Sequence, residues 1–172
     1  MNKRTRPIII TGFMGAGKTT VAAVLAHKLA CKMIDLDAFI TENTGRTPQM
    51  IIDEDGEPRF RELESRALRV ALEKEGASVI ALGGGTWTIA GNRSLIKEHD
   101  GFTVWLDAPF ELCWERIFMA ENNSRPFARD LKSAQALYHN RRAIYDQAML
   151  RIEVTVEKSA EMLAAEIVSA VS

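Results

Sequence analysis

The chain has 172 residues, of which 47% are hydrophobic and 26% charged, proportions that are ordinary for a globular protein with one sizeable core. Its net charge of -1 gives no support for a surface that binds nucleic acid or an anionic membrane. No apolar run approaches the ~20 residues of a membrane span, and the short basic start has no separate apolar region of a signal peptide. We therefore expect a cytoplasmic enzyme without a nucleic-acid or membrane partner.

Strand-like apolar stretches alternate with helical patterns along the whole chain, without an internal repeat or a linker. We expect strands at 7–11, 32–36, 77–82, 102–106 and 151–156, and helices at roughly 17–30, 37–44, 59–75, 91–98, 109–119, 130–148 and 159–171. This alternation predicts an α/β domain, in which helices cover both faces of a parallel sheet. Ligands of such sheets bind beyond the carboxyl ends of the strands, where we look for functional residues.

The first strand and the first helix are joined by Gly12–Thr19, which matches the phosphate-loop pattern G-x-x-x-x-G-K-[ST] in full. Glycines at 12, 15 and 17 permit backbone angles and a close approach that side chains would block. The loop N–H groups and the helix N-terminus then point at the anion. Lys18 can reach the outer phosphates, and the Thr19 hydroxyl can ligate Mg²⁺. This stretch predicts a site for a nucleoside polyphosphate.

The second strand ends in Asp35-Leu36-Asp37, beside the expected phosphate loop. Carboxylates two residues apart on a strand project the same way. One could orient metal-bound water and the other could hold a substrate hydroxyl. The alternative is that Asp37 only caps the following helix.

Two further motifs are candidates for binding a second substrate. An acidic turn at 53–57 leads into a helix on which Arg61 and Glu64 lie three residues apart. Glu64 could hold the planar Arg61 fork for a ligand carboxylate, although spacing alone favours an exposed ion pair of little energetic value. Gly83-Gly84-Gly85 follows the third strand, where glycines let backbone touch a ligand or simply form a flexible turn.

The last third of the chain offers more ambiguous signals. Asp107 resembles a metal-side acid at a strand end, but Pro109 makes a helix-start acid the better interpretation. The polar segment that contains Arg125 is expected to be a mobile lid that closes over phosphates, or else a solvated loop. Arg141 and Arg142 are adjacent on a helix and cannot face the same way, and spacing does not say which faces the site.

Cys31 and Cys113 are far apart, lie among apolar residues and have no metal-site spacing, which predicts buried free thiols. The three histidines form no metal or nucleophile pattern.

In this order the motifs resemble those of shikimate kinase, over roughly residues 8–168. The set that carries the resemblance is Gly12–Thr19, Asp35-x-Asp37, Gly56-Glu57-x-x-Phe60-Arg61-x-x-Glu64, Gly83-Gly84-Gly85, Arg125-Pro126 and Arg141-x-x-x-Tyr145. The resemblance implies a nucleoside-monophosphate-kinase-like, three-layer fold of the phosphate-loop NTPase type with a five-stranded parallel sheet of order 2-3-1-4-5. It implies one kinase domain over 1–172, with an acceptor-binding region at about 37–64 and a lid at about 119–130.

The implied reaction is Mg²⁺-dependent transfer of the γ-phosphoryl group of ATP to the 3-hydroxyl of shikimate. This step belongs to the route to chorismate and the aromatic amino acids, and family members are typically monomers. Two alternatives remain open. One is a kinase for a related polyol acid such as quinate, aminoshikimate or gluconate. The other is a nucleotide-binding accessory module without turnover.

The resemblance also implies a role for each matching residue. The catalytic residues would be Lys18, Asp37 and Arg125. ATP would be bound by Gly12, Met14, Gly15, Ala16, Gly17, Lys18, Thr19, Thr20, Arg116 and Arg125. Shikimate would be bound by Asp37, Arg61, Gly83, Gly84, Gly85 and Arg141. Mg²⁺ would be held by Thr19 and, through water, by Asp35.

The chain departs from the family pattern at three places. Phe127-Ala128 follows the lid Arg-Pro where Leu-Leu is common, and Ala143 stands where proline is common. Ile52 takes the place of an aromatic residue before the Gly-Glu turn, which could alter the wall of the acceptor pocket.

Overall fold

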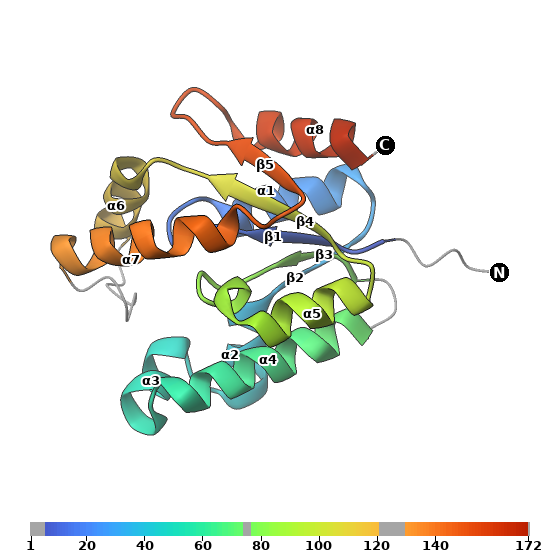
Figure 1. The fold of residues 1–172 in the computed structure, drawn as a ribbon. Coiled ribbons are helices and arrows are strands. Elements are labelled where there is room, and N and C mark those ends of the chain that lie inside the picture. The colour runs from blue at the N-terminus through green and yellow to red at the C-terminus, as the bar shows by residue number, and fades with distance from the viewer. Residues whose placement is uncertain (1–5, 74–76, 121–129, 172) are drawn as a thin grey trace.

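The computed structural model describes residues 6–73, 77–120 and 130–171 (Figure 1). Its single sheet contains β1 (Ile8–Thr11), β2 (Lys32–Asp35), β3 (Ala77–Ala81), β4 (Phe102–Asp107) and β5 (Leu150–Glu153). All four strand pairs are parallel, and the order is β2-β3-β1-β4-β5. The predicted fold class and strand order are confirmed.

The helices lie on both faces of this sheet (Figure 1). They are α1 (Lys18–Lys28), α2 (Leu36–Thr44), α3 (Pro48–Asp55), α4 (Glu57–Glu73), α5 (Ala90–Glu98), α6 (Phe110–Met119), α7 (Leu131–Tyr145) and α8 (Ala160–Val171), with a short 3₁₀ turn η1 (Thr86–Thr88). Helices α1 and α8 pack against each other on one face, and α4 and α5 pack together on the other. Helices α2 and α3 pack against α4 and extend beyond the sheet.

The centre of the core is β1, whose isoleucines at 8, 9 and 10 are at most 5% exposed. Ile9 pairs with Ile80 of β3 on one side and with Thr103 of β4 on the other. A parallel strand covered on both faces is expected to be a continuous hydrophobic run, as this one is. Because all strands run the same way, the segments that follow β1, β2, β3 and β4 meet at one edge of the sheet.

The boundary between β2 and α2 differs from the prediction. β2 ends at Asp35, and α2 begins at Leu36. Asp35 is the N-cap, because its Oδ1 accepts a hydrogen bond of 3.0 Å from the Ala38 N–H. Asp37 therefore lies in the first helical turn. The inference that both carboxylates project from one strand was wrong, and so was the alternative that Asp37 is the cap.

The acidic turn expected at 53–57 is the end of a helix that the sequence analysis missed. In α3, Thr47 Oγ1 accepts a hydrogen bond of 3.3 Å from the Met50 N–H, and Pro48 occupies the first helical position. This Thr-Pro pair is a helix-start signal that was interpreted only as a break. Gly56, with a φ of +88°, then separates α3 from α4.

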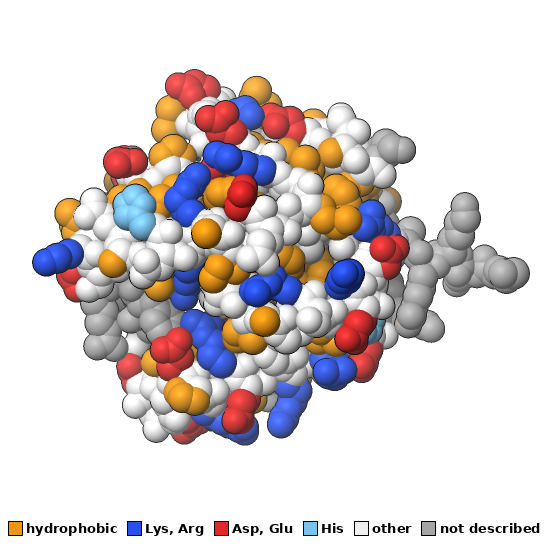
Figure 2. Space-filling view, in the orientation of Figure 1, with side chains coloured by type: hydrophobic (Ala, Val, Ile, Leu, Met, Phe, Trp, Pro, Cys, Tyr) orange, Lys and Arg blue, Asp and Glu red, His pale blue; other side chains and the backbone are white. Residues whose placement is uncertain are grey.

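Surface and composition agree with a small α/β domain. On the face drawn in Figure 2, basic and acidic side chains are interspersed, in keeping with the net charge of -1. Among the helices of the described residues, none combines the length and the apolar character that a bilayer crossing needs. Neither Cys31 nor Cys113 forms a disulfide, as predicted, although only Cys113 is fully buried.

Candidate active site

The phosphate loop leaves the carboxyl end of β1 and enters α1 with three glycines at positive φ: +146° at Gly12, +76° at Gly15 and +95° at Gly17. Space as well as backbone conformation requires glycine at the first position. A Cβ on Gly12 would lie 2.7 Å from the Leu106 carbonyl oxygen. The loop is therefore shaped to present N–H groups in a tight concave turn.

Lys18 is buried within this loop, and its Nζ donates to the carbonyl oxygens of Gly12 at 2.8 Å and Phe13 at 2.9 Å. Its ammonium group is thus held inside the curve of the loop, where an anion would be bound. The neighbouring Ala16 is buried and Thr20 is exposed.

Helix α6 supports the loop from the side. A Cβ on Gly15 would lie 2.6 Å from the Cys113 carbonyl oxygen, so α6 contacts the loop backbone directly. Arg116 of the same helix donates from Nη1 to the Gly15 carbonyl oxygen at 3.1 Å, and its Nη1 lies 3.3 Å from the position of a Cβ on Gly17. The guanidinium of Arg116 is thereby fixed at the outer rim of the phosphate loop.

Thr19 and Asp35 meet at the same edge. The Thr19 hydroxyl donates to Asp35 Oδ2 at 2.5 Å, while Asp35 Oδ1 caps α2. The pair presents hard oxygen donors beside the loop. Among the described residues there is no cluster of three or more acidic, histidine or cysteine side chains that could hold a metal alone. A site with so few protein ligands suits Mg²⁺, which usually keeps several waters and binds phosphate oxygens.

The three glycines after β3 lie against four charged side chains from three helices. A Cβ on Gly83 would lie 3.0 Å from Asp37 Oδ1 and 2.8 Å from Glu64 Oε1. A Cβ on Gly84 would lie 3.3 Å from Arg141 Nη1, and one on Gly85 would collide with the Arg61 guanidinium. The turn is therefore the place where the predicted acceptor residues of α2, α4 and α7 come together.

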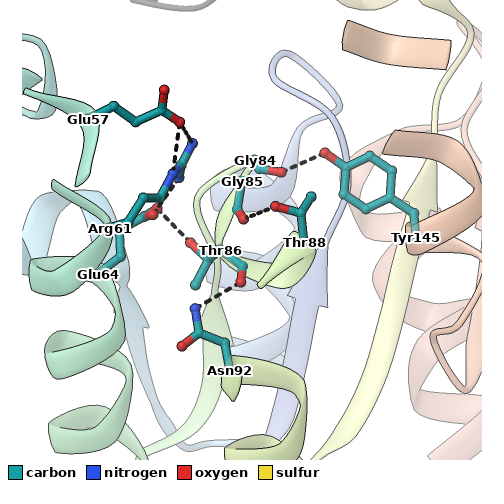
Figure 3. Close-up of polar contacts among 9 residues, drawn as sticks. All are labelled: Glu57, Arg61, Glu64, Gly84, Gly85, Thr86, Thr88, Asn92 and Tyr145. Carbon is teal, nitrogen blue, oxygen red and sulfur yellow. Dashed lines mark hydrogen bonds and ion pairs between the residues drawn. The ribbon is translucent and has the colours of Figure 1, made fainter. Parts of the chain in front are cut away.

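Arg61 is held by carboxylates of its own helix (Figure 3). Its Nη1 forms a very short ion pair with Glu64 Oε2, and its Nε lies 3.3 Å from Glu57 Oε1. Glu64 is only 1% exposed, and its Oε1 accepts a hydrogen bond of 2.7 Å from the Thr86 hydroxyl. The exposed ion pair that spacing favoured is thus excluded. A buried carboxylate with these partners fixes the guanidinium firmly.

The two adjacent arginines of α7 face different parts of the molecule. Arg141 is buried beside Gly84, whereas Arg142 reaches Asp107 with two hydrogen bonds, of 2.6 Å and 3.1 Å. The sequence left this choice open, and the structure places Arg141 at the glycine turn.

Asp107, at the end of β4, has neither of the roles considered for it. It is buried and paired with Arg142 and with Arg151 of β5, whose Nη2 lies 2.6 Å from Oδ2. Both guanidinium groups also lie 5.0 Å from the ring centroid of Trp105. The acid is therefore part of a structural ion-pair cluster, which no spacing rule would have shown, since its members lie 35 and 44 residues away.

The two halves of the site meet at Met14. This loop residue is 5% exposed, and its Cγ lies 3.6 Å from the position of a Cβ on Gly84. Sequence analysis placed Met14 on the nucleotide side only, and gave no role to Thr86. Arg125 and most of the expected lid lie outside the described residues.

Comparison with known proteins identifies the family and the fold. A family model described as shikimate kinase matches residues 14–172. The chain belongs to the shikimate kinase family. A shikimate kinase of Geobacter metallireducens is 39% identical over 94% of this chain and 89% of its own length, and one of Lactococcus lactis subsp. lactis is 40% identical over 93% and 94%.

A solved shikimate kinase from Acinetobacter baumannii, in complex with shikimate, has the same fold. It is 34% identical, with a TM-score of 0.89 over 98% of this chain and 94% of its own. The family resemblance inferred from the ordered motifs is therefore confirmed. Membership makes this chain an ATP-dependent phosphotransferase that acts on an alcohol group.

Proposed function

We propose that this shikimate kinase family member transfers the γ-phosphoryl group of ATP to the 3-hydroxyl of shikimate, giving shikimate 3-phosphate for chorismate and aromatic amino acid synthesis. The observation that carries the proposal is the glycine turn. Three consecutive glycines bring two guanidinium groups and two carboxylates to one place, and one of these carboxylates, Glu64, is engaged by Arg61 and Thr86. The same turn lies within van der Waals reach of the phosphate loop through Met14. A small polyol that bears one carboxylate is complementary to this set.

The donor half would work mainly by positioning and by neutralising charge. ATP would be held by the phosphate loop, by Thr20 and by Arg116 at the rim, with Lys18 close to the transferred group. Phosphoryl transfer needs little covalent chemistry from the protein, so fixed N–H groups and one buried ammonium are suitable tools. Lys18 is already inside the loop, where it would exchange its contacts with the Gly12 and Phe13 carbonyl oxygens for phosphate oxygens.

On the acceptor half, Arg61 and Arg141 would bind the carboxylate and the three glycines would line the pocket. Asp37 would accept the hydrogen bond of the reacting hydroxyl and assist its deprotonation. Asp37 lies in the first turn of α2, next to Gly83, and therefore between the carboxyl end of β2 and the glycine turn. Holding the hydroxyl in line with the phosphorus would account for much of the rate enhancement.

Mg²⁺ fits the donor set beside the loop. The Thr19 hydroxyl would ligate the ion, and Asp35 would act through water. The ion would supply neutralisation of the phosphate charge when bound. Asp35 has a second task in the protein itself, since it caps the helix that carries Asp37.

The same proposal extends to the organisation of the chain. One kinase domain would span 1–172, with an acceptor-binding region at about 37–64 and a lid at about 119–130 that brings Arg125 to the phosphates. The protein would act as a cytoplasmic monomer whose partners are its small-molecule substrates.

The deciding experiment is coupled ADP release from Mg²⁺–ATP by the full chain, with shikimate, quinate, aminoshikimate or gluconate as acceptor. We expect release that depends on shikimate, at least about tenfold above that with the other acceptors. Turnover with another polyol acid alone would retain the mechanism and overturn the substrate. ATP binding without acceptor-dependent release would favour an accessory module.

A further inference from the structure

Tyr145, the last residue of α7, contacts the glycine turn formed by residues 83–85 (Figure 3). Its side chain is 1% exposed and points from α7 toward the glycines. Its hydroxyl donates to the Gly84 carbonyl oxygen at 2.6 Å. The Arg141 guanidinium lies beside the same glycine, near enough to lower the pKa of the phenol. A phenol that donates to a carbonyl oxygen can still accept a hydrogen bond, so this hydroxyl is able to serve the carbonyl and the guanidinium together.

We propose that Tyr145 is a positioning residue for acceptor binding, because its hydroxyl fixes the Arg141 guanidinium and the Gly84 carbonyl in one arrangement. The inference rests on the proposed function, in which Arg141 binds the acceptor carboxylate. Tyr145 itself need not touch either substrate.

Three features make the hydroxyl a rigid link. Burial raises the pKa of Tyr145 to about 12 although the neighbouring Arg141 lowers it, so the phenol stays protonated and remains a donor at neutral pH. The ring lies 6.1 Å from that of Trp105 in a tilted contact, which limits its rotation. Because the peptide group is planar, holding the Gly84 carbonyl also fixes the direction of the Gly85 N–H.

A second hydrogen bond ties the same two segments together. Trp87 Nε1 of η1 donates to the Ile144 carbonyl oxygen at 2.9 Å. Two hydrogen bonds thus join the end of α7 to the segment after β3. Tyr145 donates to Gly84, and its neighbour Ile144 accepts from Trp87. We expect loss of the Tyr145 hydroxyl to leave the Trp87 bond in place, so that the helix stays docked while one restraint on Arg141 is lost.

Tyr138 provides a matched control on the same helix. Its hydroxyl donates to the Ala108 carbonyl oxygen at 2.7 Å and accepts from Arg142 Nη1 at 2.8 Å. Burial raises the pKa of this phenol as well. Each tyrosine therefore donates to a carbonyl oxygen and has an arginine of α7 beside it, but of these two only Tyr145 does so at Gly84. Phenylalanine at 138 retains the ring and its edge-to-face contact with Phe13.

The test compares Tyr145→Phe with Tyr138→Phe in the full chain by steady-state kinetics with each substrate varied. We expect Tyr145→Phe to raise the KM for shikimate about tenfold, while the KM for ATP stays within about twofold. Tyr138→Phe should leave the KM for shikimate and the KM for ATP within about twofold of the parent values. It should lower Tm by about as much as Tyr145→Phe does. Equal KM values for shikimate in the two variants would overturn the inference.

A double-mutant cycle with Arg141→Ala separates positioning from general loosening. If Tyr145 acts mainly through Arg141, then Tyr145→Phe should lower kcat/KM for shikimate by less than about threefold in the Arg141→Ala background. A tenfold loss in that background would contradict the inference. Absence of shikimate-dependent turnover in the parent chain is a different result, since it would overturn the proposed function itself.

Discussion

The nucleotide side and the acceptor side of this site are built in opposite ways. The nucleotide side comes largely from one stretch, Gly12–Thr19, whose backbone conformation forms the anion cradle. The acceptor side is assembled from α2, α4, the turn after β3 and α7, so that Asp37 and Arg141 meet across more than half of the chain. A continuous motif carries its geometry with it, whereas a discontinuous site exists only after the sheet has formed.

The largest expected effect comes from a substitution on the nucleotide side alone. Lys18→Ala should reduce kcat/KM by about 10³-fold or more with any acceptor, because a buried charge at the transferred group is lost. ADP release measured with saturating shikimate checks this. Retained turnover would show that the loop amides suffice without Lys18.

The next effect should be confined to the acceptor side. Arg61→Ala should lower kcat/KM for shikimate by about 10²-fold, while the Kd for ATP measured by calorimetry changes by less than about twofold. Arg59→Ala is the matched control, because Arg59 lies on the same helix but forms only an exposed ion pair with Glu62. If Arg61→Ala weakened ATP binding equally, the division into two sides would be wrong.

A methyl group added at Gly85 tests the contact between this glycine and Arg61 on the acceptor side. Gly85→Ala would place a Cβ against the Arg61 guanidinium, so we expect about a tenfold higher KM for shikimate and an unchanged KM for ATP. Gly91→Ala meets no atom within 4 Å and should leave both constants unchanged. Similar behaviour of the two variants would mean that Arg61 moves aside at little cost.

The smallest effect on turnover concerns the cluster around Asp107, which lies on neither side. Asp107→Asn should reduce the free energy of unfolding by about 2–3 kcal/mol, because two guanidinium groups lose their shared buried partner. The kcat/KM for shikimate should change by less than about threefold. Urea unfolding compared with Glu62→Gln, the partner in an exposed ion pair, checks the first point. A loss of kcat/KM as large as that of Arg61→Ala would connect the cluster to catalysis.

The same contrast explains what could be predicted from sequence. The phosphate loop follows from a local motif, and the order of the motifs along the chain carries the family resemblance. The strand order was implied by that resemblance. The α3 helix was missed because Thr47-Pro48 suggested a break, although the pair also starts helices. Asp37 was placed on a strand because alternation was extended two residues past Asp35, where the cap had already begun a helix.

Other features depend on tertiary structure and have no local signal. Spacing could not choose between Arg141 and Arg142, because the choice is made by Asp107 from a different element, 35 residues away from Arg142. Nor could it show that Glu64 is buried, since that depends on Thr86 and the turn after β3. Tyr145 was recognised as part of a motif, but its hydrogen bonds become visible only when α7 lies against the glycines.

The contact between α6 and the phosphate loop has a practical consequence for measuring motion. Cys113 is completely buried where α6 meets Gly15, and burial raises the pKa of its thiol to about 11. It therefore stays protonated and shielded while the helix is seated. In a Cys31→Ser background, the rate at which a thiol reagent labels Cys113 would therefore report how often α6 separates from the loop. The measurement can be made with and without bound nucleotide.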